Sequence, residues 1–191
     1  MSNLFALFIT AMVINNVVLT KFLGMCPLLG VSRKASSAVG MGTAVIFVIF
    51  GSSVFTYILY YQVLVPLKLQ YMDLITFILV IAAFVQFVEM VLKKYSMGLY
   101  KALGIYLPLI TTNCVVLYVT LVNIIEKFNF VEMCVYSIAV PAGFMLILYI
   151  FSTIRERLDT ADVPVYFKGN PIALIVAAIM AAIFTAFAGL V

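Results

Sequence analysis

The sequence predicts an all-α integral membrane protein. Apolar residues make up 66% of its 191 residues and charged residues only 9%, whereas an average soluble domain carries roughly 25% charged residues. A soluble fold of this size buries only about 70% of its chain, so it could not hide this much apolar surface. The charged residues divide the chain into six apolar runs, and a bilayer-spanning helix needs roughly 20 apolar residues. Six transmembrane helices in one membrane domain are therefore expected.

The apolar runs occupy residues 4–20, 38–61, 74–92, 102–125, 133–154 and 171–190. Helices are expected in all of them, because a chain in lipid must satisfy its backbone hydrogen bonds within each segment. The short connections leave no room for a large nucleotide or flavin site, which we expect on other polypeptides.

The cations of the connecting loops predict the orientation. The first, third and fifth connections hold nine of the eleven Lys and Arg residues, and loops rich in Lys and Arg stay in the cytoplasm. Both termini should then face the outside. No basic run exceeds two residues, so the charge indicates topology and not nucleic-acid binding. No signal peptide is expected, since no cation precedes the run that starts at Leu4.

Similar pentapeptides suggest an internal repeat. Residues 15–19 read NNVVL and residues 113–117 read NCVVL, 98 positions later. The approximate halves 1–97 and 98–191 would each contain three spans. An odd number of spans inverts the second half relative to the first, as in many transport proteins. We therefore expect two inverted three-helix repeats with a broken first helix in each half.

Two of the three cysteines lie in segments that a straight helix would not tolerate. Cys114 falls near the middle of the fourth run and follows the stretch 107–113, which contains a proline. Cys26 lies between Gly24 and Pro27, and proline and glycine both disfavour a continuous helix there. A bend could return Cys26 towards the membrane interior and towards Cys114. Cys134 lies in an ordinary apolar run and is interpreted as a small apolar residue.

The cysteine pair is a candidate for half of a metal site. Thiolates favour iron–sulfur clusters, zinc or Cu(I), and an iron–sulfur cluster ordinarily has four protein ligands. The chain contains no histidine, so Cys26 and Cys114 would need two more ligands from a partner or from a second copy. The alternative is that both cysteines are merely small apolar residues.

Other polar residues are weaker candidates. Gln86 and Glu89 lie three positions apart on one helical face, and an intramembrane carboxylate is a default candidate for an ion path. Alternatively, Glu89 pairs locally with Lys93 at i+4. The charged run 155–159 is interpreted as a solvated loop that could dock a soluble partner. No motif indicates catalysis by this chain alone.

These segments carry a family resemblance that covers essentially the whole chain. Two cysteine motifs resemble the signatures of the A subunit of Rnf complexes, called Rsx in some bacteria. They are Val13–Leu19 followed by Lys21–Pro27, and Leu103–Cys114. Three further segments are similar too: Gln86–Met90, Ile154–Leu158 and Asp162–Pro164. The related E subunit of the sodium-pumping NADH:quinone reductase is the second choice, because Asn15-Asn16 and Cys26-Pro27 fit the Rnf version better.

The resemblance implies a subunit of an ion-translocating ferredoxin:NAD oxidoreductase in a bacterial or archaeal cytoplasmic membrane. A homologous E-type subunit of opposite orientation would share a 2Fe-2S cluster with it, two cysteines coming from each. On this chain those positions are Cys26 and Cys114. Flavins and other clusters would lie on the remaining subunits (B, C, D and G), and ferredoxin and NAD would be met only indirectly. Electron transfer would be coupled to the movement of Na⁺ or H⁺.

Two other classes of protein fit part of the pattern. A secondary transporter also uses inverted repeats and broken helices, but it would have no use for the cysteine pair. A purely structural scaffold subunit would make both cysteines dispensable. The cysteine pair is thus the feature that separates the three hypotheses.

Overall fold

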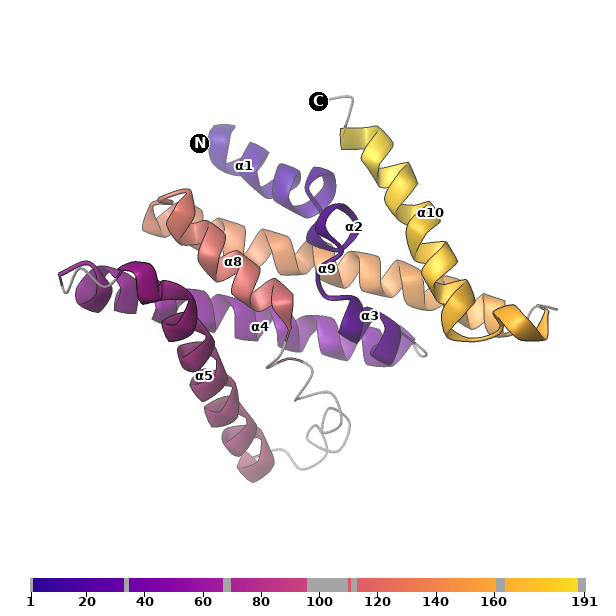
Figure 1. Cartoon of the computed structure of the whole chain (residues 1–191), viewed down its shortest axis with the longest axis horizontal. Coiled ribbons are helices and arrows are strands. Elements are labelled where there is room, and N and C mark those ends of the chain that lie inside the picture. The colour runs from indigo at the N-terminus through magenta and orange to yellow at the C-terminus, as the bar shows by residue number, and fades with distance from the viewer. Residues whose placement is uncertain are drawn as a thin grey trace.

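The computed structural model describes residues 2–32, 35–66, 70–95, 110, 113–160 and 164–188, and every regular element within these ranges is helical (Figure 1). The α-helices are α1 Ser2–Ile9, α2 Val17–Lys21, α3 Met25–Val31, α4 Ala35–Leu59, α5 Asp73–Tyr95, α8 Cys114–Ile125, α9 Phe130–Asp159 and α10 Asn170–Ala188. The π-helical turns are η1 Thr10–Ile14 and η2 Tyr60–Leu64, and the 3₁₀ turns are η3 Gln70–Met72 and η4 Val165–Phe167.

Three of these helical stretches are long and apolar enough to cross a membrane. They are Ser37–Leu64, Asp73–Val91 and Phe130–Asp159, with 28, 19 and 30 residues. At 1.5 Å per residue the longest extends about 45 Å. Shorter apolar helices occupy Leu4–Ile14, Cys114–Ile125 and Asn170–Ala186. The prediction of an all-helical membrane protein is thus supported, while residues 102–109 of the fourth predicted run lie outside the described residues.

Helices α4 and α9 form the central pair of the molecule, lying side by side along its longest axis (Figure 1). Val45 and Ile49 of α4 and Leu148 of α9 are fully buried. Within the apolar stretches of α4 and α9, 44% and 50% are buried inside the chain. Helix α9 is capped by Asn129, whose backbone N–H donates to Oε2 of Glu132 at 2.9 Å, as in a capping box.

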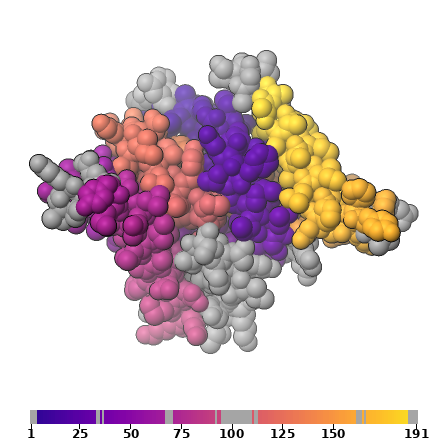
Figure 2. Space-filling view, in the orientation of Figure 1, coloured from indigo at the N-terminus to yellow at the C-terminus, as the bar shows by residue number. Residues whose placement is uncertain are grey.

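Helices α5 and α10 diverge from this pair on opposite sides (Figure 1). Only 17% of the apolar stretch of α5 is buried, and its outward side chains include Leu79, Phe87 and Met90. Exposed apolar surface of this extent on a single helix is typical of contact with lipid or with another membrane subunit. The segments before α4 and the helix α8 lie beside each other on one face of the molecule (Figure 2).

Candidate functional site

The first apolar segment is broken at Asn16. The π-helical turn η1 closes when the Asn15 N–H donates to the Thr10 carbonyl at 2.7 Å. Asn16 then takes extended backbone angles (φ −64°, ψ 115°) and its Oδ1 accepts a hydrogen bond from the Val18 N–H at 3.1 Å. Its Nδ2 donates to the Met12 carbonyl, also at 3.1 Å. One buried side chain thus supplies both a donor and an acceptor to the backbone where the helix is interrupted.

Helix α8 starts from the same kind of cap. Asn113 has φ −74° and ψ 114°, and its Oδ1 accepts from the Val115 N–H at 3.1 Å. Asn113 follows Asn16 by 97 positions. The sequence match paired Asn113 with Asn15, so the caps correspond with a shift of one residue. Of the residues expected to break the helix before Cys114, all except Ile110 and Asn113 lie outside the described residues.

Beyond the caps the two segments differ. Helix α2 ends after five residues at Phe22, which has a left-handed backbone (φ 54°), and Gly24 is left-handed as well (φ 79°). The short helix α3 then begins with Met25, so the chain bends where Gly24 and Pro27 led us to expect it. A Cβ on Gly24 would lie 2.8 Å from Cε2 of Phe144 and 2.9 Å from Cγ2 of Val115. Both the backbone angle and the packing require glycine here.

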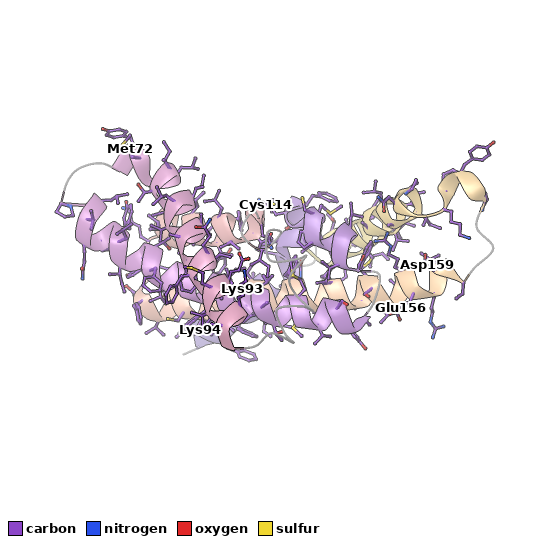
Figure 3. All side chains as sticks on the ribbon, turned by 90° about the horizontal axis from the view of Figure 1, so that it is seen from below. Met72, Lys93, Lys94, Cys114, Glu156 and Asp159 are labelled. Carbon is purple, nitrogen blue, oxygen red and sulfur yellow. The ribbon has the colours of Figure 1, made fainter. Side chains whose placement is uncertain are left out.

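The bend brings the first cysteine segment to the second. The Gly24 N–H donates to Sγ of Cys114 at 3.3 Å, across 90 residues of sequence. Cys26 follows Gly24 by two residues, so their Cα atoms lie within about 8 Å of each other. Cys26 and Cys114 are both exposed, whereas Cys134 is half-buried. Figure 3 shows Cys114 midway along the molecule, between Met72 at one end and Asp159 at the other.

Helix α3 is fixed at its other end by a buried arginine. Arg155 is only 5% exposed. Its Nη1 donates to the Leu29 carbonyl at 2.8 Å and to Oγ of Ser32 at 2.9 Å, and its Nη2 donates to Oδ1 of Asn170 at 3.2 Å. The neighbouring Glu156 accepts from the Ala35 N–H at 2.9 Å.

The interpretation of residues 155–159 as a solvated loop is therefore wrong. They form the last turns of α9, and two of them bind the backbone on either side of the α3–α4 connection. A signal for this was available, because Arg155 directly follows an apolar run and continues its helical pattern. The prediction assumed that charged side chains are exposed, and so the burial of Arg155 was missed.

A polar cavity of about 270 Å³ lies between α1, α8 and α9. Its lining includes oppositely charged residues, Lys21 and Glu126, together with the hydroxyl groups of Tyr118 and Tyr136. The polar residues Thr10, Asn15 and Thr20 complete that part of the wall. Gln86 and Glu89 are on α5, where the first is exposed and the second half-buried, and neither lines this cavity.

The chemistry of the donor set limits what the chain holds by itself. Within the described ranges, no three His, Cys, Asp or Glu residues gather closely enough to hold a metal ion. The two exposed thiols of Cys26 and Cys114 come from segments that touch, and thiolates are soft donors suited to iron–sulfur chemistry. The arrangement fits one half of a four-thiolate site, and a neighbouring polypeptide would have to supply the other two thiolates.

Comparisons with known proteins find similar sequences over nearly the whole chain. Residues 4–191 match the family model described as "Rnf-Nqr subunit, membrane protein". The A subunit of an ion-translocating oxidoreductase complex from Shewanella sediminis is 51% identical over 191 residues, covering 100% of both chains. The A subunit of the Na⁺-translocating ferredoxin:NAD⁺ oxidoreductase complex of Acetobacterium woodii is 52% identical over 95% of both chains. The corresponding protein from Thioalkalivibrio sulfidiphilus is 54% identical over 96% of this chain and 95% of its own.

Proposed function

Since this chain belongs to the Rnf-Nqr family of membrane subunits, we propose that it relays electrons across the bilayer through a 2Fe-2S cluster shared with a homologous subunit. The chain is a membrane subunit of an ion-translocating oxidoreductase complex, as its relatives of 51–54% identity are. Those relatives bear the name of the A subunit in such complexes, which favours the Rnf type over the quinone reductase.

The hydrogen bond between the Gly24 N–H and Cys114 Sγ carries this proposal. It joins the two cysteine segments, and backbone N–H groups directed at cysteine sulfur are one of the ways in which proteins tune iron–sulfur potentials. Bound by Cys26 and Cys114 with two partner thiolates, a 2Fe-2S cluster would supply a one-electron carrier within the membrane. This chain would supply two of the four thiolate ligands, and both of its thiols are exposed and accessible to a neighbouring subunit.

The proposed partner is a homologous E-type subunit of opposite orientation. Two thiols make half of a four-ligand site, and both are exposed on this chain. The remaining Rnf subunits (B, C, D and G) would carry the flavins and further clusters, and ferredoxin and NAD would react with those subunits. A secondary transporter or a scaffold would have no need for two exposed thiols on segments that contact each other.

Iron loading of co-expressed subunits tests the proposal. The chain purified alone under anaerobic conditions should carry little iron, and co-expression with its homologous partner should restore both the iron and a reduced-cluster EPR signal. Co-expression with the partner's two ligand cysteines replaced by serine is the matched control and should restore neither. Full iron loading of the chain alone would overturn the shared site.

We also propose the inverted topology of two three-helix halves, with both termini outside. The matching caps at Asn16 and Asn113 support the repeat, and the excess of Lys and Arg in the odd-numbered connections supports the orientation. A reporter fused to Val191 should be active if it is an exported enzyme and silent if it is a cytoplasmic one. The opposite pattern would reverse the orientation.

Three polar residues, Glu89, Gln86 and Glu126, are candidates for the route of the coupling ion. Glu89 and Gln86 stay candidates because they lie on an apolar helix, and an intramembrane carboxylate marks an ion path by default. Glu126 is a second candidate, since it lines the polar cavity between α1, α8 and α9. Replacing each glutamate by glutamine and measuring ion uptake per electron transferred would separate the two. Loss of coupling with unchanged electron transfer identifies the residue on the path.

A further inference from the structure

We propose that Arg155 is a positioning residue for the Cys26 thiol, a role that rests on the proposed cluster site. Arg155 lies on α9, far from Cys26 in sequence, and the sequence alone assigned it no role. Its guanidinium is buried and makes three hydrogen bonds to neutral acceptors on two other elements. A buried arginine without such partners would be strongly destabilising, so the site is built around it.

The helix that carries Cys26 is too short to hold its own position. Helix α3 has seven residues, and isolated helices shorter than about 12 residues are marginal even in favourable sequences. Its four last carbonyls have no intrahelical partner. Arg155 Nη1 binds one of them, that of Leu29, and a cation at a helix C-terminus is also favoured by the helix dipole.

Arg155 fixes the end of α3 that lies opposite the Cys114 contact. The N-terminal end is held by the Gly24 N–H at Cys114 Sγ, and the C-terminal end by Arg155 through Leu29 and Ser32. Cys26 lies between these two ends, in the first turn of α3. Leu28 and Val31 also anchor α3 in the core, so loss of the Arg155 contact would shift the C-terminal end of α3 without detaching it. That shift would change the separation of Cys26 from Cys114.

Two neighbours reinforce the arrangement. Nη2 of Arg155 also binds the first residue of α10, Asn170, and Glu156 binds the first N–H of α4 through Ala35. Consecutive side chains of α9 thus hold the end of α3 and the start of α4. Figure 3 shows Cys114 near the middle of the molecule and Glu156 towards the end at which Asp159 lies.

The test compares Arg155→Gln with Arg157→Gln in the co-purified complex. Arg157 is exposed on the same helix turn and serves as the matched control. Outer-shell changes typically weaken metal retention about 10- to 100-fold. We expect Arg155→Gln to lose iron during dialysis at least about 10-fold faster than wild type, with altered EPR g-values in the cluster that remains, and Arg157→Gln to behave as wild type. Arg155→Lys should restore part of the iron, since an ammonium can still bind Leu29 and Ser32.

A second measurement does not depend on the cluster. In the full chain purified alone with Cys134→Ser, a short bifunctional thiol reagent should link Cys26 to Cys114. Arg155→Gln should reduce that yield several-fold, and Arg157→Gln should not. If Arg155→Gln does not accumulate, Arg155→Lys is measured in its place. An unchanged cross-linking yield in Arg155→Gln overturns the positioning role. A reduced yield supports that role even if the wild-type complex holds no iron, and the missing iron would then refute only the proposed cluster.

Discussion

Helices α2 and α8 start from the same kind of cap, but the cysteines that follow the two caps are placed differently. Asn16 and Asn113 have nearly identical backbone angles and the same 3.1 Å bond from Oδ1 to the second following N–H. Cys114 is the residue directly after its cap, and α8 continues without interruption. In the first half, two left-handed residues, Phe22 and Gly24, separate the cap from the cysteine helix.

In the proposed repeat, this difference makes the proposed cysteine site asymmetric. In the second half the cap itself fixes the cysteine, because Cys114 is the first residue of the capped helix. In the first half the cysteine depends on a turn, on the packing at Gly24 and on Arg155. We therefore expect the first half to be sensitive to changes at many positions and the second half to be sensitive mainly at the cysteine.

The largest expected effect is the loss of either exposed cysteine. A hydroxyl cannot replace the soft thiolate that iron–sulfur chemistry requires. Cys26→Ser or Cys114→Ser should abolish the cluster EPR signal and the ferredoxin–NAD electron transfer of the assembled complex. The helices should still insert, since the substitution is small.

Cys134→Ser is the control in the same complex, because Cys134 lies in an uninterrupted helix and shares no motif with the other two. It should retain iron and turnover. Normal iron and normal turnover in Cys114→Ser would instead refute the redox role of this chain and favour a transporter or scaffold.

The next largest effect is expected at Gly24. Alanine at a left-handed position costs roughly 1–2 kcal/mol, and its Cβ would crowd Phe144 and Val115. Gly24→Ala should lower the thermal midpoint of the purified chain and reduce cluster occupancy in the complex. Gly40→Ala in α4 is the control, since its Cβ would meet nothing within 4 Å. A Gly24→Ala complex with the iron content and midpoint of Gly40→Ala would show that the turn is not needed.

Some of this comparison could be predicted from the sequence. The apolar fraction and run lengths predicted the helical membrane fold, because both depend on composition alone. The bend before Cys26 was predicted too, since Gly24 and Pro27 act through local backbone preferences. The sequence match paired Asn113 with Asn15, whereas the structure has the same cap at Asn16, because the Asn15-Asn16 pair offers two matches and only hydrogen bonding distinguishes the cap.

The contacts that cross the chain could not be predicted. Arg155 is buried because acceptors 126 and 123 residues earlier in the sequence, at Leu29 and Ser32, turn towards it, and arginine is rarely buried otherwise. The approach of Gly24 to Cys114 likewise depends on how α8 packs against the turn. Local propensities contain no information on such pairings, and a single sequence offers no covariation to reveal them.

The smallest effects are expected for substitutions of the two cap residues, Asn16 and Asn113. The Nδ2 of Asn16 donates to the Met12 carbonyl, whereas Nδ2 of Asn113 is buried and finds no acceptor within the described part of the chain. Serine at either position keeps an oxygen for the cap but removes the amide donor. Asn16→Ser should therefore destabilise the chain by about 1 kcal/mol, the net worth of one hydrogen bond, and Asn113→Ser should be nearly neutral. The two alanine variants serve as references, since both lose the cap oxygen at about 1 kcal/mol each and Asn16→Ala loses the bond to Met12 in addition. Thermal unfolding of the four variants in one detergent measures the difference. Equal midpoints for the two serine variants would show that the caps are equivalent in energy as well as in geometry, and the asymmetry would then begin only at Phe22.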